Sequence, residues 1–506
     1  MRGKSGLLIL TTLALVNSCT VFSLDFSAYV ALTSPTINQP AIDEGTYYRP
    51  AEYTDDFSEI FRANPINTQI NWRSIGEQNI LVLPISLPRR PKEQLDNDNG
   101  ETAKIIIENA FFGQEQTTQW ESVASFYNKS SYGQLAISGI VADWYTPHNL
   151  DGVLDNIADW ESGNNTISNT AITKKLLRQA ITAFKEAHPT LVDQYDLDQD
   201  GYLDAVYMIY SNPISSGAKE HEFIGTNELY WAYSSHDIRS PSPAPKANAY
   251  AWTSYDFLNL NYTWFNNKPD AHTLIHEVGH LLGLNDYYNT NRPGSTPLYG
   301  PTGGADMMDF SLGDHTGLSK MLLNWVKPYY VEQATEITIK PFSTSGELVL
   351  LAPNWNNSPF DEYLLLEYYA PIGLNHYDAS LLSNYRLFDR YGLKVYHVDA
   401  SLVMRSVMVG EQRVEYPVLN NDNSPTNSDV LNNQPVLYRL LDKRGLTPLI
   451  AGNTFSNESL YTLNDNFGVE NYENFMFNDG NKLQLGFKIT KQTKASITLE
   501  FYPITA

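Results

Sequence analysis

The chain has 506 residues, of which 34 are Lys or Arg and 57 are Asp or Glu, so its formal net charge is −23. Hydrophobic residues make up 42% of the sequence, which is enough for sizeable cores and excludes a wholly disordered chain. The acidic excess argues against nucleic acid as a partner, because phosphate binding requires a basic face. A single cysteine excludes an intramolecular disulfide and a cysteine-based structural zinc site.

The first residues predict an export signal over residues 1–19. Arg2 and Lys4 precede an apolar run at 7–16, which is too short to span a bilayer but typical of a secretory signal. The segment that ends at Cys19 is similar to a bacterial lipobox, so two interpretations stay open: a lipid anchor on Cys19, or a simple cleaved signal. Either one places the protein outside the cytoplasm, secreted or lipid-anchored at the cell surface. No later apolar run has transmembrane length, so we expect membrane contact only through such an anchor.

Residues 20–77 are polar and irregular, and we interpret them as an N-terminal arm or pro-segment. In the part of the chain that follows, residues 78–332, short apolar runs at 79–85 and 205–210 predict buried strands. Apolar residues along one helical face from Ile172 to Phe184 predict a helix, which should end at Pro189.

After residue 332 the pattern changes to short strand-like runs separated by turns rich in Asn, Gly and Pro. This change predicts a separate all-β, sandwich-like domain over residues 333–506. The expected strands include residues 337–340, 347–351, 363–367, 393–398 and 496–501.

One motif carries the chemistry: the sequence HEVGHLLGLND, which begins at His276. His276 and His280 are four residues apart, so on a helix both imidazoles project from one face toward a shared metal. Glu277 lies where a carboxylate can take a proton from metal-bound water. Gly283 should end the helix, because glycine tolerates the left-handed conformation of a sharp exit. That turn could bring Asp286 back as a third ligand and leave the fourth position for water.

Other ligands can be weighed against Asp286. One large class of zinc peptidases uses a glutamate on a later helix, but no glutamate occurs between His280 and Glu332. At the start of the motif helix, Asp270 is a candidate N-cap. The remaining candidates for the third ligand have no comparable spacing argument and stay open: Asp306, Asp309, Asp314 and His315.

The extended motif resembles the metzincin-type pattern with Asp in place of the usual third histidine. This variant is a feature of the immune inhibitor A-like secreted metallopeptidases. The resemblance covers about residues 78–400 and includes VASFYNKSSYGQL from Val123, YDLDQDGYLD from Tyr195 and GGADMMD from Gly303. It implies an α+β fold, with a metzincin-like catalytic domain ahead of the β domain.

The resemblance also implies the roles of individual residues. Zinc would be held by His276, His280 and Asp286, with Glu277 as the general base. Met308 matches the methionine turn beneath the metal, with the adjacent Met307 as an alternative. Where the family often has Trp before the Asp of this turn, the chain has Ala305.

The activity implied is that of a zinc-dependent endopeptidase, which hydrolyses peptide bonds of proteins or peptides with a zinc-activated water. Glu277 would accept the proton of this water and pass it to the leaving amine. Two other functions stay open: a surface binding protein on a peptidase scaffold that no longer cleaves, and a zinc amidase on a non-peptide substrate. The sequence does not choose among candidates for a donor to the oxyanion, which are Tyr287, Tyr288, His236 and His315.

A second metal site is expected in the acidic stretch from Asp196 to Asp204. Asp196, Asp198 and Asp200 alternate, Gly201 follows, and Asp204 comes later. The spacing resembles the first half of an oxygen-rich calcium loop, although position 12 is not acidic. Clustered carboxylates repel one another unless a cation lies among them. The alternative is an acidic surface turn ahead of the 205–210 strand.

Overall fold

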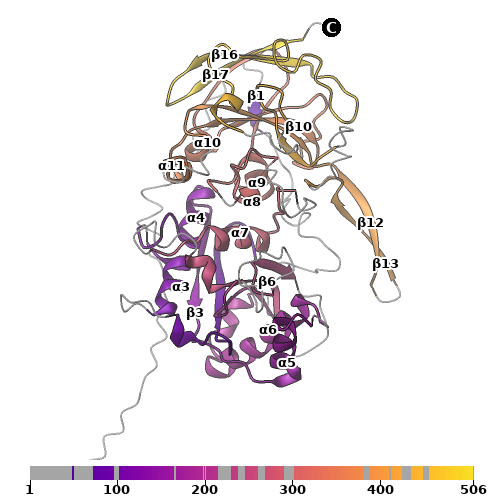
Figure 1. Cartoon of the computed structure of the whole chain (residues 1–506). Helices are drawn as coiled ribbons and strands as arrows, with labels where there is room; N and C mark the ends of the chain where they lie inside the picture. The colour runs from indigo at the N-terminus through magenta and orange to yellow at the C-terminus, as the bar shows by residue number, and fades with distance from the viewer. Residues whose placement is uncertain are drawn as a thin grey trace, which may run out of the picture.

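The structure is a computed structural model, whose helices and strands are labelled in Figure 1. The structure describes residues 48–50, 72–95, 102–114, 116–164, 167–197, 199, 201–214, 229–236, 246–259, 268–289, 301–310, 312–380, 388–409, 412–423, 435–447 and 455–504. The signal segment and Cys19 lie outside these residues. In the described part of the chain, no helix combines the length and the apolar character needed to cross a membrane.

The helices named here are α3 (Ala103–Phe112), α4 (Val123–Ser130), α5 (Val153–Glu161), α6 (Asn169–Ala187), α7 (His272–Leu281), α8 (Met307–Phe310), α9 (Gly317–Leu322), α10 (Phe342–Ser345) and α11 (Leu374–Ser380). The strands are β1 (Tyr48–Pro50), β2 (Gly76–Ile85), β3 (Leu135–Val141), β4 (Tyr202–Tyr210), β5 (Tyr233–His236), β6 (Lys246–Ser254), β7 (Tyr329–Val331), β8 (Thr335–Ile339), β9 (Leu348–Leu351), β10 (Glu362–Tyr369), β11 (Gly392–Asp399), β12 (Leu402–Val409), β13 (Gln412–Leu419), β14 (Tyr438–Leu440), β15 (Asn466–Phe467), β16 (Leu485–Gln492) and β17 (Ile497–Pro503).

The first half of the described chain folds around a five-stranded sheet with the order β3-β2-β4-β6-β5. Neighbouring strands are parallel, except that the edge strand β5 runs antiparallel to β6. Helices cover both faces. Along β2, Ile80 and Val82 pack with α3, α4 and α7, whereas Leu81 and Leu83 pack with α5 and α6. This alternation follows from the two-residue period of a strand.

The elements predicted for this half are confirmed. The run at 79–85 lies in β2 and the run at 205–210 lies in β4. Helix α6 ends at Ala187, just ahead of Pro189. Both strands read as continuous apolar runs because helices bury them on both faces. The described chain mixes helices and strands as expected, and in this half a mainly parallel sheet lies between two layers of helices.

The second half of the described chain is built mainly from strands, with the short helices α10 and α11 between them. One sheet has six strands in the order β1-β7-β9-β10-β11-β14, and another has four in the order β15-β16-β17-β8. The expected strands correspond to β8, β9, β10, β11 and β17. Strands β12 and β13 pair with each other in a hairpin that extends from the body of the molecule (Figure 1).

The six-stranded sheet forms the connection between the two halves. On β10, Leu364 and Leu366 belong to a hydrophobic cluster shared with the four-stranded sheet. Leu365, which points to the opposite face, belongs to the cluster that contains α4, α7 and α9. The N-terminal arm contributes β1, which pairs with β7 at the edge of this sheet. A continuous core therefore runs from the first sheet, through the helices that carry the motif, into the six-stranded sheet.

Candidate metal centre

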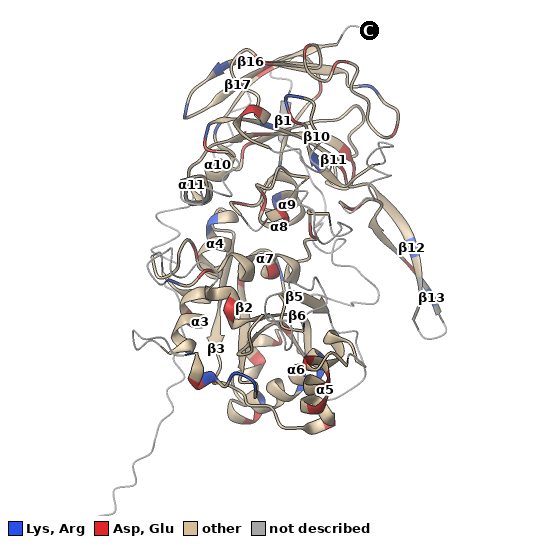
Figure 2. Ribbon diagram, in the orientation of Figure 1, with Lys and Arg blue, Asp and Glu red and all other residues tan. Residues whose placement is uncertain are grey.

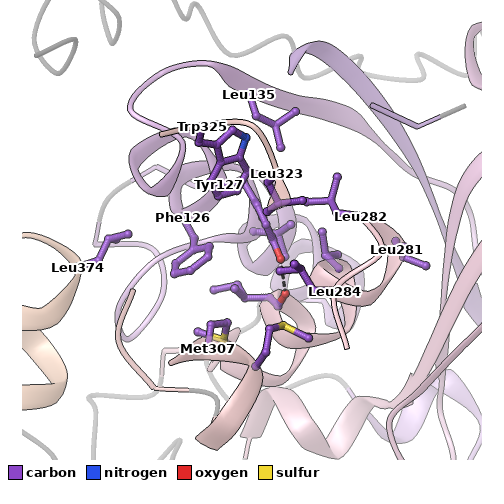
Figure 3. Packing of buried hydrophobic residues seen from close by; sticks show 14 of the residues in the cluster. Phe126, Tyr127, Leu135, Leu281, Leu282, Leu284, Met307, Leu323, Trp325 and Leu374 are labelled. Carbon is purple, nitrogen blue, oxygen red and sulfur yellow. Dashed lines mark hydrogen bonds between the residues drawn. The ribbon is translucent and has the colours of Figure 1, made fainter. Parts of the chain in front are cut away.

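Helix α7 carries the motif and is packed into the core along one side. Its apolar residues Leu274, Ile275, Val278 and Leu281 are fully buried. From α4, the Tyr127 hydroxyl donates a hydrogen bond of 2.7 Å to the Ile275 carbonyl, in the packed cluster that Figure 3 shows. The helix is thus fixed from the side opposite its histidines.

The start of α7 differs from the prediction. The sequence indicates Asp270 as the N-cap, but Ala271 occupies that position and has no capping side chain. The Asp270 carboxylate instead accepts hydrogen bonds from the backbone N–H of His272, at 3.0 Å, and from its Nδ1, at 2.6 Å. The His272 ring also stacks on Trp120, with centroids 4.5 Å apart. The helix therefore begins one residue later than predicted, and Asp270 binds the first helical residue instead.

The end of α7 is as predicted. The last helical residue is Leu281, and Gly283 follows with φ +102°, in the left-handed region that favours glycine. The N–H groups of Gly283 and Leu284 donate to the carbonyls of His280 and Gly279, at 2.9 and 3.0 Å. These two bonds form a Schellman motif, which satisfies the last carbonyls and reverses the chain.

This reversal brings Asp286 to the two histidines. Its Oδ1 lies 3.0 Å from His276 Nε2 and 3.1 Å from His280 Nε2. One ligand atom from each of the three residues lies within 4.8 Å of the others, and among the described residues this is the group of three or more that could hold a metal ion. The candidate ligands expected from the motif therefore converge.

Both histidines are oriented by their second ring nitrogen. His276 Nδ1 lies 2.7 Å from the Met307 carbonyl oxygen, and His280 Nδ1 lies 2.7 Å from the Leu284 carbonyl oxygen. A carbonyl oxygen can only accept, so each Nδ1 donates its proton to a carbonyl, and Nε2 is the ring atom that lies toward Asp286. Such an outer hydrogen bond on each ring is typical of histidines that bind metal.

The donor set fits zinc. Two imidazoles and one carboxylate are ligands that zinc takes in catalytic sites, with a fourth position kept for water. Tetrahedral bonds of about 2.0–2.1 Å separate ligand atoms by about 3.3 Å, close to the separations around Asp286. Burial alone would raise the pKa of Asp286, but the two imidazoles outweigh burial and hold this pKa well below its usual range. Burial lowers the pKa of His280, but Asp286 outweighs it and raises this pKa to about 9.

Glu277 lies beside these residues and is buried, with 5% of its surface exposed. In Figure 2 part of the α7 ribbon is red, the colour of Asp and Glu, and Glu277 is the acidic residue of this helix. Its Oε2 atom has no hydrogen-bond partner among the described residues. Burial raises the pKa of Glu277, and the imidazoles of His280 and His276 oppose that rise only in part. A buried carboxylate oxygen without a partner carries a desolvation penalty that a bound water or substrate group would relieve.

Residues 306–310, named here the Met-turn, pass beneath the motif helix. A Cβ atom added to Gly279 would lie 2.5 Å from the Met308 sulfur, so the glycine is what lets this side chain reach the helix. Met307 contributes its carbonyl oxygen to His276. The sequence leaves Met307 and Met308 as alternatives, and the structure assigns them different contacts with α7.

The other candidates for a third ligand have different partners. Asp306 accepts hydrogen bonds from the Met308 and Thr316 N–H groups, at 2.7 and 2.6 Å. Asp314 forms a buried ion pair with Lys320, at 2.6 Å. The two remaining candidates also have other partners. Asp309 accepts hydrogen bonds from Thr302 and Gly304, and His315 packs among Phe126, Tyr127 and Trp325.

The candidate oxyanion donors lie in different environments. The Tyr287 hydroxyl is buried and accepts a hydrogen bond from Ser319. Tyr288 is half-buried, and its ring lies 6.3 Å from the His276 ring. His315 is buried in the core, and the side chain of His236 lies outside the described residues. Of the four, Tyr288 is thus the described side chain that faces a ligand.

The expected calcium loop is described in part. Asp198 and Asp200 lie outside the described residues. Asp196 Oδ2 accepts the Gly201 N–H at 3.0 Å, and Asp204 Oδ2 accepts the Leu197 N–H at 3.0 Å.

Some residues around the site were not predicted. Tyr127 binds α7, Thr316 binds the Met-turn and Glu367 binds the start of α9, yet all three lie far from the motif in sequence. Tyr127 falls in a stretch that the resemblance covers, but nothing in the local pattern indicates its hydrogen bond to Ile275. These contacts arise only when distant segments pack.

Residues 90–336 match the family described as immune inhibitor A peptidase M6, catalytic domain. The match contains α7, Asp286 and the Met-turn, and it ends ahead of β9. No curated protein is similar to the chain at a significant level. The resemblance read from the motifs is confirmed by the family match. Residues 90–336 are therefore similar to the catalytic domain of the immune inhibitor A peptidase M6 family, and this similarity implies a metallopeptidase that acts on proteins or peptides.

Proposed function

We propose that the protein is a zinc-dependent endopeptidase that works outside the cytoplasm. The observation that carries this proposal is the convergence of His276, His280 and Asp286 beside the buried Oε2 of Glu277, which has no hydrogen-bond partner within the described part of the chain. The intact Glu277 argues against a binding protein that has lost catalysis, since this residue is the general base the reaction needs. The peptidase family match makes an amidase that acts on non-peptide substrates the weaker alternative.

His276, His280 and Asp286 would hold the zinc ion. When bound, zinc supplies Lewis acidity, which polarises a carbonyl and lowers the pKa of a water molecule. Glu277 accepts a proton from the attacking water and returns it to the nitrogen of the leaving amine. Its burial supports this role, because a carboxylate whose pKa is raised by burial gives up a proton less readily and can therefore carry one between the two steps.

The finer fold assignment belongs to the same proposal. A metzincin-like catalytic domain over 78–332 is supported by the Met-turn, whose Met308 packs against the motif helix at Gly279. A sandwich-like domain over 333–506 is supported by the cluster that the six-stranded and four-stranded sheets share.

Export and calcium binding are further parts of the proposal. The apolar run at 7–16 and Cys19 support secretion or a lipid anchor at the cell surface. The loop from Asp196 to Asp204 supports a structural calcium ion, because Gly201 adopts φ +86° where the calcium-loop pattern requires a sharp turn. Such an ion would stabilise a fold in which no disulfide forms within the chain.

The test uses the purified full-length chain with casein as substrate. We expect cleavage by the wild type, loss of cleavage with a chelator, and recovery on adding zinc. Glu277→Ala should bind zinc at the same stoichiometry and cleave about 10²–10⁴-fold more slowly. Equal cleavage by Glu277→Ala and the wild type would reject the mechanism. His276→Ala, which removes a ligand, serves as the comparison that loses both zinc and cleavage.

A further inference from the structure

The six-stranded sheet is joined to the underside of the candidate metal centre by a series of buried polar contacts. We propose that Glu367 of β10, held by Lys394 of β11, is a positioning residue that fixes the Met-turn and thereby sets the affinity of the centre for zinc. This inference rests on the proposed function and gives the region after residue 336 a part in it.

The first step is the contact between the Met-turn and the metal ligands. The Met307 carbonyl accepts from His276 Nδ1, at 2.7 Å. The Met308 carbonyl accepts from the backbone N–H of Tyr287, at 2.7 Å, and Tyr287 directly follows Asp286. A shift of the Met-turn therefore moves the segments that carry two of the three ligands.

The Asp306 carboxylate fixes the Met-turn itself. Asp306 has no exposed surface, and its Oδ1 accepts the Met308 N–H at 2.7 Å. Its Oδ2 accepts both the N–H and the hydroxyl of Thr316, each at 2.6 Å. Hydrogen bonds to a buried carboxylate are among the stronger ones in proteins. The position of Thr316 thus determines the position of the turn.

Thr316 and the residue after it are connected to the six-stranded sheet by hydrogen bonds. The next residue, Gly317, starts α9 and donates its N–H to Glu367 Oε2, at 3.1 Å. The Tyr438 hydroxyl of β14 donates to Thr316 Oγ1, at 2.8 Å. A Cβ atom on Gly317 would lie only 2.8 Å from Leu348 Cδ1, so the start of α9 rests directly on the sheet.

Glu367 is itself held by Lys394. Lys394 lies directly opposite it in the antiparallel register of β10 and β11, with Nζ 3.7 Å from Oε1. Both side chains are almost completely buried, and the ammonium group lies 4.5 Å from the centre of the Tyr369 ring. Apolar residues of similar volume can often replace a buried ion pair without loss of stability. The pair can therefore be removed while the sheet stays folded.

The experiment compares two double variants of the full-length chain. Glu367→Gln/Lys394→Met removes both charges but keeps an oxygen that accepts from Gly317, whereas Glu367→Leu/Lys394→Met leaves that N–H without an acceptor. Zinc affinity is measured by competition with a chelator, and kcat and KM are measured with casein-derived peptides. We expect the Gln variant to stay close to the wild type. The Leu variant should bind zinc about 10–100-fold more weakly and lose kcat, with little change in KM.

A control separates positioning from general damage to the sheet. Glu362 lies at the other end of β10 and is paired with His397 at 2.7 Å, far along the strand from the Met-turn contacts. Glu362→Gln should lower the midpoint of thermal unfolding without changing zinc affinity. Equal zinc affinity in the Leu and Gln double variants would overturn the proposal.

If the Leu double variant does not fold, a third variant tests whether the contacts between the sheet and the Met-turn set zinc affinity. Tyr438→Phe removes only the hydroxyl that donates to Thr316, and we expect it to weaken zinc binding severalfold; an unchanged affinity would overturn the proposal. A wild-type chain that binds no zinc would reject the proposed function, and this inference with it. A wild type that binds zinc as tightly as Tyr438→Phe rejects the inference alone.

Discussion

At the scale of single residues, Gly279 shows how the motif helix depends on what packs beneath it. The position lies between the two histidines, and a methyl group there would meet the Met308 sulfur at 2.5 Å and the Tyr127 hydroxyl at 3.3 Å. The absence of a side chain is therefore a packing requirement, set by the close approach of the Met-turn to α7.

We expect Gly279→Ala to destabilise the fold by about 1–3 kcal/mol, the usual cost of overpacking a core. The added methyl group should be tolerated better once the Met308 side chain is shortened. The double variant Gly279→Ala/Met308→Ala should thus be more stable than the sum of the single changes implies, with a coupling of about 0.5–3 kcal/mol. Urea denaturation of all four proteins measures this, and strictly additive changes would contradict it.

A second residue-scale prediction concerns Asp309 and pH. Burial raises the pKa of Asp309 to about 7, against the opposing hydrogen bonds from Thr302 and Gly304. The unfolded chain has the ordinary, lower pKa, so the folded state binds more protons between about pH 4 and pH 7. The contribution of Asp309 to stability is therefore complete below about pH 4 and is lost as the pH rises through about 7.

Asp309→Asn should remove this dependence, because an amide resembles the protonated carboxyl group and can still accept both backbone hydrogen bonds. Near pH 4 the two proteins should have similar free energies of unfolding. Toward pH 8 the variant should become the more stable one. Denaturant titrations at several pH values give the comparison, and a constant difference across this range would show that Asp309 does not titrate as predicted.

At the scale of elements, the Schellman turn after α7 does two things at once. It satisfies the last carbonyls of the helix, and it returns the chain so that Asp286 faces His276 and His280. The glycine that permits this turn could be recognised in the sequence. The direction in which the chain leaves the turn could be anticipated, but the distances at which Asp286 arrives could not.

We expect Gly283→Ala to lower stability by about 1 kcal/mol, since alanine is strained at φ +102°. Because the strain lies between the helix and Asp286, zinc affinity should fall as well. Gly480→Ala is the matched control: Gly480 has φ +88°, open space around its Cβ position and no contact with the site. Both variants should lose similar stability, and zinc binding as tight in Gly283→Ala as in the control would contradict the prediction.

At the scale of the whole molecule, the core does not stop where the peptidase family match ends. The cluster that contains α7 and the Met-turn also contains Leu348, Leu350 and Leu365, all beyond residue 336. These side chains cover the helices that carry the candidate site. The half that matches the peptidase family therefore relies on the six-stranded sheet for part of its buried surface.

A chain that ends at residue 336 should fail to unfold cooperatively, because it exposes this apolar surface and loses the contacts at Gly317 and Thr316. As a control, residues 402–419 can be replaced by a short Gly-Ser turn. Among the described strands, β12 and β13 pair only with each other, and Asn420 N–H already donates to the Ser401 carbonyl at 2.8 Å. The control should keep a single thermal transition; cooperative unfolding of the 1–336 chain would contradict the shared core.

The sequence by itself indicated β2, β4 and five strands of the second half, the end of α6 ahead of Pro189, the end of α7 at Gly283 and a set of candidate ligands. These features are local: apolar periodicity, glycine conformation and the spacing of His276, His280 and Asp286 act within a few turns of chain. The sequence could not determine the mainly parallel order of the first sheet or the start of α7, because each depends on a partner distant along the chain.

Only the tertiary structure decided how the candidate site is supported. It showed that Met307 contacts His276 whereas Met308 packs against Gly279. It also showed that Asp306 binds Thr316 and does not lie among the candidate ligands, and that Glu367 binds the start of α9. Each of these contacts joins segments that are far apart in sequence or differ by the direction of one side chain. Burial makes them necessary, because a polar group removed from water must find its partner wherever the packed chain provides one.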